Sequence, residues 1–295
     1  MTNNHSEKKI LVGVDGSGAN TSAIRWAVLE AHARHEPLIA LYAWHLPVMA
    51  YSAPSYIAVS PEESTRAGDA LVEQAVGELA SEFDVKYEIR SVEGPASKVL
   101  HDVASSGEID LVVVGSRGHN AMTNLVLGSV SHALSHHTQK PLVIVPHDFS
   151  DERDVDAKRR VVVGVDGSDR AIVALQWAAE EAAIHDAALE VVVAWTWLAY
   201  PADLVVSVPD WTALKTAADE IMEKSLAQLH APDLEIIKTV REGHPADVLV
   251  ERAAAAHLLV VGSRGLGHAR EVLLGSTSHY CAHRSQSPIA IIPSP

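Results

Sequence analysis

Short apolar runs alternate along this chain with longer segments in which the apolar residues recur at helical spacing. Residues 109–114 form one such run, rich in β-branched residues and apolar on both faces, as is typical of a parallel strand covered by helices on both sides. Ile24, Ala27, Val28 and Ala31 instead share one face of a helix. Strict alternation of strand and helix predicts right-handed crossovers and a doubly wound, Rossmann-like α/β sheet.

The same pattern predicts five parallel strands in each half of the chain. In the first half they are residues 10–14, 38–44, 85–92, 109–114 and 142–145. In the second half they are residues 161–165, 189–197, 234–240, 258–261 and 289–292. Helices are expected between the strands, and they include one that runs to about Phe83 after a loop with Pro47, Pro54 and Pro61, one that follows Pro95 and one that begins at Ser129.

The two halves of the sequence repeat one another at matching spacing. The segment Val-Gly-Val-Asp-Gly-Ser at 12–17 returns at 163–168, and Trp26 and Trp177, both interpreted as core residues, follow at equal distance. Each half ends on an apolar run that starts with proline. We therefore expect two tandem copies of one domain, residues 1–147 and 160–295, joined by a linker at 148–159 that is mostly acidic.

A glycine-punctuated loop follows the fourth predicted strand of each half. Gly115-Ser116-Arg117-Gly118 precedes Gly128-Ser129 by nine residues, and Gly262-Ser263-Arg264-Gly265 precedes Gly275-Ser276 by the same number. Such glycines suit a loop whose backbone N–H groups approach an anion, with a helix N-terminus beyond it that favours phosphate. The alternatives are ordinary surface turns and, for the serine, a plain helix N-cap.

An aspartate follows the first predicted strand of each half. If the first and fourth strands are neighbours where the winding reverses, Asp15 and the first glycine loop open into one crevice, and so do Asp166 and the second loop. Each carboxylate could accept a hydrogen bond from a ribose or an adenine amine, or form a turn with the next glycine. Because a carboxylate repels a triphosphate, we expect it at the nucleoside end. Arg117 and Arg264 are the nearest cations and could offset phosphate charge, although an arginine in a turn is usually solvated.

Composition narrows the range of partners and compartments. A formal net charge of −15 argues against nucleic-acid binding, because affinity for the phosphate backbone needs clustered Lys and Arg. The polar stretch 1–9 leaves no room for a signal peptide, and the longest apolar run, 191–200, is too short to span a bilayer. We expect the single cysteine, Cys281, to be a buried core thiol. These features predict a cytoplasmic protein without membrane insertion.

Other kinds of site find less support. A Walker loop would require Gly-Lys-Ser or Gly-Lys-Thr, and neither tripeptide occurs. His132 with His136, and His279 with His283, have a helical spacing that can hold a metal, but no third ligand is evident, so surface polar residues are favoured and a metal site stays undetermined. Neither half shows an unambiguous general base or nucleophile, so no catalytic residue is assigned.

Taken together, the Val-Gly-Val-Asp-Gly-Ser start, the Val-Val-Val-Gly-Ser-Arg-Gly strand end and the spacing of the glycine loop resemble the universal stress proteins, and more narrowly their ATP-binding, tandem-domain branch found in actinobacteria. The resemblance covers nearly the whole chain, twice. It implies an adenine nucleotide alpha hydrolase-like fold and one ATP in each domain, with Mg²⁺ left open as a companion of the phosphates.

The resemblance also implies which residues hold the nucleotide. In the first domain it puts Gly13, Val14, Asp15 and Ala43 around the nucleoside, Val114 at the base, and Gly115, Gly118, Gly128, Ser129 and Val130 at the phosphates. The matching second set is Gly164, Val165, Asp166, Ala194, Val261, Gly262, Gly265, Gly275, Ser276 and Thr277.

The role implied by the resemblance is stress response, dormancy or growth regulation. Nucleotide occupancy would change a conformation or an association that an unidentified regulatory protein reads. The resemblance further implies that the domains pair through their last strands as a pseudo-dimer within the chain, and that two chains form a homodimer. Two alternatives remain open, namely a slow ATP hydrolase or nucleotidyl-transferring enzyme, and an interaction scaffold without a ligand.

Overall fold

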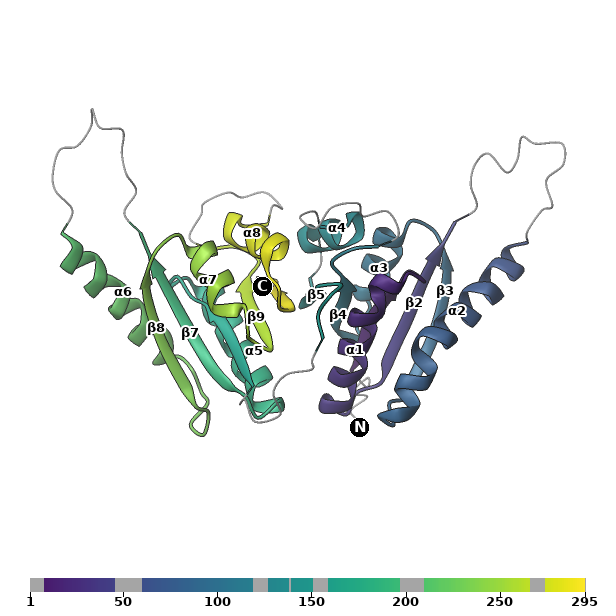
Figure 1. Cartoon of the computed structure of the whole chain (residues 1–295), viewed down its shortest axis with the longest axis horizontal. Coiled ribbons are helices and arrows are strands. Elements are labelled where there is room, and N and C mark those ends of the chain that lie inside the picture. The colour runs from purple at the N-terminus through teal and green to yellow at the C-terminus, as the bar shows by residue number, and fades with distance from the viewer. Residues whose placement is uncertain are drawn as a thin grey trace, which may run out of the picture. The chain divides into compact units, whose positions relative to one another are not determined.

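The computed structural model describes residues 8–45, 60–118, 127–137, 139–150, 159–196, 210–265 and 274–294. The chain divides into two compact units, Met1–Ser150 and Asp151–Pro295. Each unit is a sheet with helices packed against it (Figure 1).

The first unit alternates strands and helices in the order that the sequence predicts. Its strands are β1 (Lys9–Val14), β2 (Leu38–Trp44), β3 (Tyr87–Glu93), β4 (Ile109–Gly115) and β5 (Leu142–Val145). Its helices are α1 (Thr21–Arg34), α2 (Pro61–Glu82), α3 (Ala96–Ala104) and α4 (Ser129–His137), with a short 3-10 turn, Gly18–Asn20, ahead of α1. The strands lie in the order β3-β2-β1-β4-β5, and all of these pairings are parallel.

The second unit repeats this arrangement. Its strands are β6 (Arg160–Gly164), β7 (Ala188–Trp195), β8 (Ile236–Glu242), β9 (Leu258–Gly262) and β10 (Ile289–Ile292). Its helices are α5 (Asp169–Ile184), α6 (Trp211–Leu226), α7 (Pro245–Ala253) and α8 (Ser276–Arg284). The strand order is β8-β7-β6-β9-β10, again with parallel pairing throughout. The predicted fold class, two doubly wound five-stranded domains in tandem, is therefore confirmed.

Each sheet reverses its winding at one place. The chain moves outward from β1 through β2 to β3, and then returns to set β4 on the other side of β1. Strands β6 and β9 are neighbours in the same way in the second unit. The first and fourth strands of each half are therefore neighbours, which meets the condition stated above, and their carboxyl ends flank the crevice where doubly wound sheets bind ligands.

The central strands form the core of each unit. Ile10, Leu11 and Val12 of β1 are fully buried, which shows that helices cover both faces of the first sheet. Val162 of β6 is fully buried in the same way. Cys281 is also fully buried, and burial raises the pKa of its thiol to about 12, so the prediction of a core cysteine is confirmed.

Two local expectations differ from the structure. Pro61 is not a loop residue but the first residue of α2, where its missing N–H needs no partner within the helix. Ser60 and Glu63 cap this helix reciprocally, each side chain accepting from the backbone N–H of the other. Trp26 is buried as predicted, whereas Trp177 on α5 is only half-buried. Small alanines and Leu175 form the buried face of α5, so the core interpretation holds for Trp26 and only in part for Trp177.

Candidate functional site

A cavity of about 750 Å³ opens at the winding reversal of the first unit. It lies at the carboxyl ends of β1, β2 and β4, with residues of α3 and the start of α4 along its sides. All of the residues predicted for this site line the cavity, namely Gly13, Val14, Asp15, Ala43, Val114, Gly115, Arg117, Gly118, Gly128, Ser129 and Val130.

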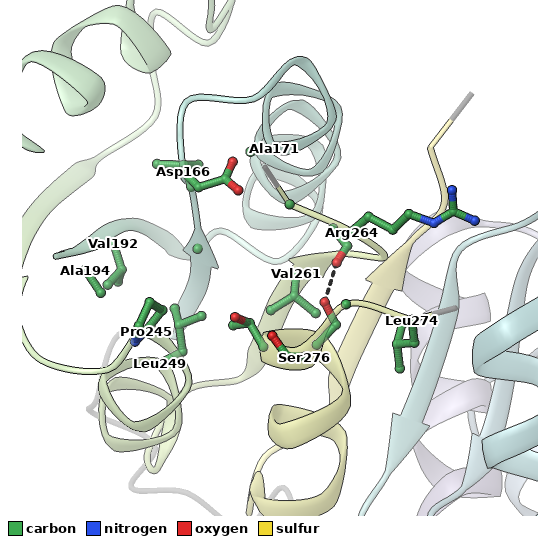
Figure 2. A pocket seen from close by; sticks show the side chains of 17 residues that line it. Asp166, Ala171, Val192, Ala194, Pro245, Leu249, Val261, Arg264, Leu274 and Ser276 are labelled. Atoms are coloured by element: carbon green, nitrogen blue, oxygen red, sulfur yellow. Dashed lines mark hydrogen bonds between the residues drawn. The ribbon is translucent and has the colours of Figure 1, made fainter. Parts of the chain in front are cut away.

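A second cavity, of about 500 Å³, opens at the equivalent place in the second unit. Every predicted residue of the second site lines it, namely Gly164, Val165, Asp166, Ala194, Val261, Gly262, Arg264, Gly265, Gly275, Ser276 and Thr277. Figure 2 shows Val192, Ala194, Pro245 and Leu249 together on one side, Asp166 above them, and Arg264 on the opposite side.

The apolar side of each cavity combines two strands with one helix. In the second unit, Pro245 and Leu249 of α7 face Val192 and Val261 across the slot (Figure 2). The same positions in the first unit hold Ala96, Leu100, Leu41 and Val114. A slot of this kind suits a flat, largely apolar group such as a nucleobase.

Small residues at the end of the first strand keep this helix close to the sheet. A Cβ on Gly13 would stand 3.1 Å from Leu100 Cδ1, and a Cβ on Gly164 would stand 2.8 Å from Leu249 Cδ1. A larger residue at either position would therefore push the helix or its leucine away. The leucines were not predicted as site residues, although the repeat of Val99-Leu100 as Val248-Leu249 was a signal for them.

The glycine loop of the first unit closes over the end of β4 through three hydrogen bonds. Ser116 N–H donates to the Val145 carbonyl at 2.8 Å, which continues the sheet by one residue. Gly128 N–H donates to the Ser116 carbonyl at 2.8 Å, and Ser131 Oγ donates to the Gly115 carbonyl at 2.6 Å. These bonds hold the start of α4 against the strand end, so that the N–H groups of its first turn lie at the cavity.

The second unit repeats these contacts. Gly275 N–H donates to the Ser263 carbonyl at 2.8 Å, and Ser278 Oγ donates to the Gly262 carbonyl at 2.6 Å. Helix α8 begins at Ser276, and its N-cap is Gly275. The N-cap interpretation of Ser276 is therefore wrong, because the serine is the first helical residue. The anchoring serines, Ser131 and Ser278, were missed because they lie two residues beyond the motif that drew attention.

Each aspartate has one oxygen fixed in a turn and the other beside the glycine loop. Asp15 Oδ1 accepts from Ser17 N–H at 2.8 Å and from Ser17 Oγ at 2.7 Å, and Gly16 has the positive φ of 73° that this turn requires. A Cβ on Gly118 would stand 2.9 Å from Asp15 Oδ2. Asp166 is held by Ser168 in the same way, and a Cβ on Gly265 would be in still closer contact with its Oδ2. Glycine is thus required where the loop passes the carboxylate.

Arg117 and Arg264 each line the cavity of their own unit. Arg117 Nη1 lies 3.0 Å from His147 Nε2. The guanidinium of Arg264 points away from Asp166 and Val261 in Figure 2. A contact of either guanidinium with phosphate therefore stays a prediction.

The paired histidines lie on the first helix after each glycine loop. The rings of His132 and His136 are 4.7 Å apart between centroids, and those of His279 and His283 are 4.5 Å apart. Within the part of the chain that the structure describes, neither pair joins a cluster of three metal-ligand side chains. None of these four histidines lines either cavity.

Comparison with known proteins gives consistent matches across the whole chain. The sequence profile described as the Universal stress protein family matches residues 7–146 and again residues 158–293. A universal stress protein of Mycolicibacterium smegmatis is 31% identical over 300 residues, covering 99% of this chain and 99% of that protein. One of Mycobacterium tuberculosis is 32% identical over 299 residues, covering 99% and 98%.

A solved structure agrees with the fold. The crystal structure of a universal stress protein from Archaeoglobus fulgidus superposes with a TM-score of 0.66 at 20% identity, covering 98% of this chain and 99% of that one. Among the described residues, the structure has no helix that is long and apolar enough to cross a membrane.

Proposed function

Because the chain belongs to the universal stress protein family and carries that family's domain twice, we propose that it binds one ATP in each domain and acts through nucleotide occupancy. The two domains of this proposal are residues 1–147 and 160–295, with 148–159 as the linker. The observation that carries it is the pair of cavities, in which a glycine loop and a helix start face an apolar slot at the winding reversal.

The residues present suit an adenine nucleotide. The base would enter the apolar slot against Val114 or Val261, and the phosphates would lie over the glycine loop and the first turn of α4 or α8. Binding through backbone N–H groups and a helix N-terminus needs no lysine in the loop, which agrees with the absence of a Walker sequence. The aspartate, which would repel a phosphate, is left for the nucleoside.

Occupancy by itself can drive a regulatory change. A ligand at about a hundred times its Kd stabilises the form that binds it by roughly 2.7 kcal/mol. We propose that this free energy favours one conformation, or one association of domains and chains, which a regulatory protein in the cytoplasm recognises during stress, dormancy or altered growth. Pairing of the two domains and of two chains belongs to this proposal.

The first test identifies what the protein carries. Protein purified without added nucleotide is denatured, and the released molecules are counted by chromatography and mass spectrometry. About two adenine nucleotides per chain support the proposal, and an excess of ADP would favour an ATP hydrolase. If the protein is empty and also fails to take up added ATP, the interaction scaffold without a ligand is favoured instead. Repeating the uptake with and without Mg²⁺ determines whether the ion accompanies the phosphates.

Calorimetry on two glycine variants assigns the sites. Gly118→Glu and Gly265→Glu each put a carboxylate where the loop already touches an aspartate, so each should abolish binding in its own domain, lowering affinity there by roughly a hundredfold or more. Half of the ATP stoichiometry should remain in each variant. Gly107→Glu is the matched control, because a Cβ at this exposed glycine meets nothing within 4 Å. Full stoichiometry in both loop variants would refute the assignment.

A further inference from the structure

Asn20 occupies the N-cap position of α1 but does not cap the helix. Asparagine is favoured at this position because its side chain accepts from a backbone N–H of the first turn. The Asn20 side chain makes no such hydrogen bond, and its φ and ψ of −91° and −6° are already close to helical. Helix capping therefore does not account for the asparagine.

The Asn20 side chain is instead buried at the first cavity. The residue is only 3% exposed, and it lines the cavity. Its Oδ1 is buried without a hydrogen-bond partner among the described residues. A buried acceptor without a donor costs about 1–3 kcal/mol, so a ligand that brings a donor recovers that cost.

The second site has no such group. Ala171 holds the equivalent position at the start of α5, and it also lines its cavity. Figure 2 shows Ala171 between Asp166 and Arg264, away from Pro245 and Leu249. This position therefore faces the polar part of a ligand rather than its base.

The surroundings of Asn20 indicate which polar group it would meet. Its Nδ2 lies 3.2 Å from the position of a Cβ on Gly115, and the carbonyl oxygen of Arg117 lies at the same distance from that point. The Asp15 carboxylate borders the same loop at Gly118. The Asp15 carboxylate and the Arg117 carbonyl are acceptors, so this edge of the phosphate loop favours a hydrogen-bond donor of the ligand. In a nucleotide, the donors outside the base are the ribose hydroxyls.

We propose that Asn20 contacts the ligand in the first domain, and that its side-chain oxygen accepts a hydrogen bond from a ribose hydroxyl. The first site would then select ribonucleotides over deoxyribonucleotides more strongly than the second site, which has alanine in that place. The inference rests on the proposed function, since it concerns the same nucleotide.

The test compares ATP, 2′-deoxy-ATP and 3′-deoxy-ATP at one site at a time. Gly265→Glu removes binding at the second site, so only the first site is measured. In this background Asn20→Ala should weaken ATP binding about threefold to tenfold, the loss expected for one hydrogen bond. Binding of the analogue that lacks the contacted hydroxyl should change by less than about twofold. Asn20→Asp keeps an acceptor and should keep the preference for ribose. In the Gly118→Glu background, where only the second site binds, Ala171→Asn should increase the preference of that site for ATP over the deoxy analogue.

The outcomes separate this inference from the proposal beneath it. If Asn20→Ala weakens ATP and both analogues equally, or leaves all three unchanged, the contact does not exist, although ATP binding stands. If the unmodified protein binds no ATP, the proposed function fails and this inference fails with it. Unliganded Asn20→Ala should melt no lower than the parent, because the side chain makes no capping bond. A lower melting temperature together with equal losses would show a structural role.

Discussion

The first strand of each domain begins with a basic residue, and this residue has different partners in the two domains. Lys9 of β1 contacts Glu108 at 3.0 Å and Glu88 at 3.3 Å, and both carboxylates are partly exposed. Arg160 of β6 lies 3.0 Å from Glu190, whose side chain is fully buried. In the first sheet the register position of Glu190 is taken by Ile39, which is also fully buried.

The buried carboxylate of the second domain is held by further donors. Arg252 Nε donates to Glu190 Oε1 at 2.6 Å, and Thr239 Oγ1 donates to the same oxygen at 2.8 Å. The first domain has Val103 and Arg90 at those positions. The residues that are the same in both domains therefore lie at the carboxyl ends of the strands. At the amino ends the domains differ, because one position holds a buried ion cluster in the second domain and an apolar side chain in the first. A fold can use both because a well-paired buried cluster and an apolar replacement have similar net stability.

Removing the charge of Glu190 should have the largest effect on stability. Glu190→Gln leaves two arginines beside a neutral amide, and we expect the second domain to lose roughly 2–4 kcal/mol while the first is unchanged. Cys281 is the only cysteine and is buried in the second domain, so its rate of alkylation in urea reports the opening of that domain alone.

The control for this prediction installs the residues of the first domain. Glu190→Ile with Arg252→Val removes the carboxylate and one of its two arginines. It should restore part of the lost stability, because the remaining Arg160 is partly exposed and keeps its hydrogen bond to the backbone carbonyl of residue 252. If Glu190→Gln opens no more readily than the parent, the cluster does not stabilise the second domain.

Two glycines should instead respond alike in the two domains. Gly94 and Gly243 have φ of 145° and 147°, and a Cβ on each would stand 2.9 Å from Val99 Cγ2 or Val248 Cγ2. Gly94→Ala and Gly243→Ala should each destabilise its own domain by roughly 1–3 kcal/mol. Urea unfolding, followed by hydrogen exchange of each domain, measures both losses, with Gly107→Ala as a control. Losses that differ by more than about 1 kcal/mol would show that the shared geometry is not what sets the cost.

Lowering the pH should have the smallest effect on stability, and this effect should arise from two carboxyl groups of the first domain. The hydrogen bond from Arg90 lowers the pKa of Glu88, and the hydrogen bond from Lys9 lowers the pKa of Glu108. A carboxyl with a lowered pKa in the folded state stabilises the fold above its unfolded pKa of about 4.3, and this stabilisation is lost as the pH falls through the folded value. Because these groups are partly exposed, the total should stay near 1 kcal/mol or below.

The measurement compares the urea midpoint of the first domain at pH 6 and at about pH 3.5. The variant Lys9→Met with Arg90→Met should lose less stability between the two pH values than the parent does. An equal loss would mean that other carboxyl groups account for the acid response.

Much of the architecture could be predicted from local pattern. The apolar runs gave the strands to within about two residues, which is the usual uncertainty of element ends. The repeat at constant spacing predicted two copies of one domain, and the glycines with Asp15 and Asp166 predicted positions that line the two cavities. These signals are local because strand periodicity, helix periodicity and turn chemistry depend on a few neighbouring residues.

The contacts between distant segments were decided by the tertiary structure. Leu100 and Leu249 line the slots because α3 and α7 pack over the ends of β1 and β6. Neither Asn20 nor Glu190 was singled out from the sequence. Only packing brings the first to a cavity and surrounds the second with arginines. The sequence by itself therefore determined the elements, the repeat and the glycine loops, because each depends on short-range sterics and periodicity. The tertiary structure decided which side chains share a site, because proximity across the chain depends on how the folded elements pack.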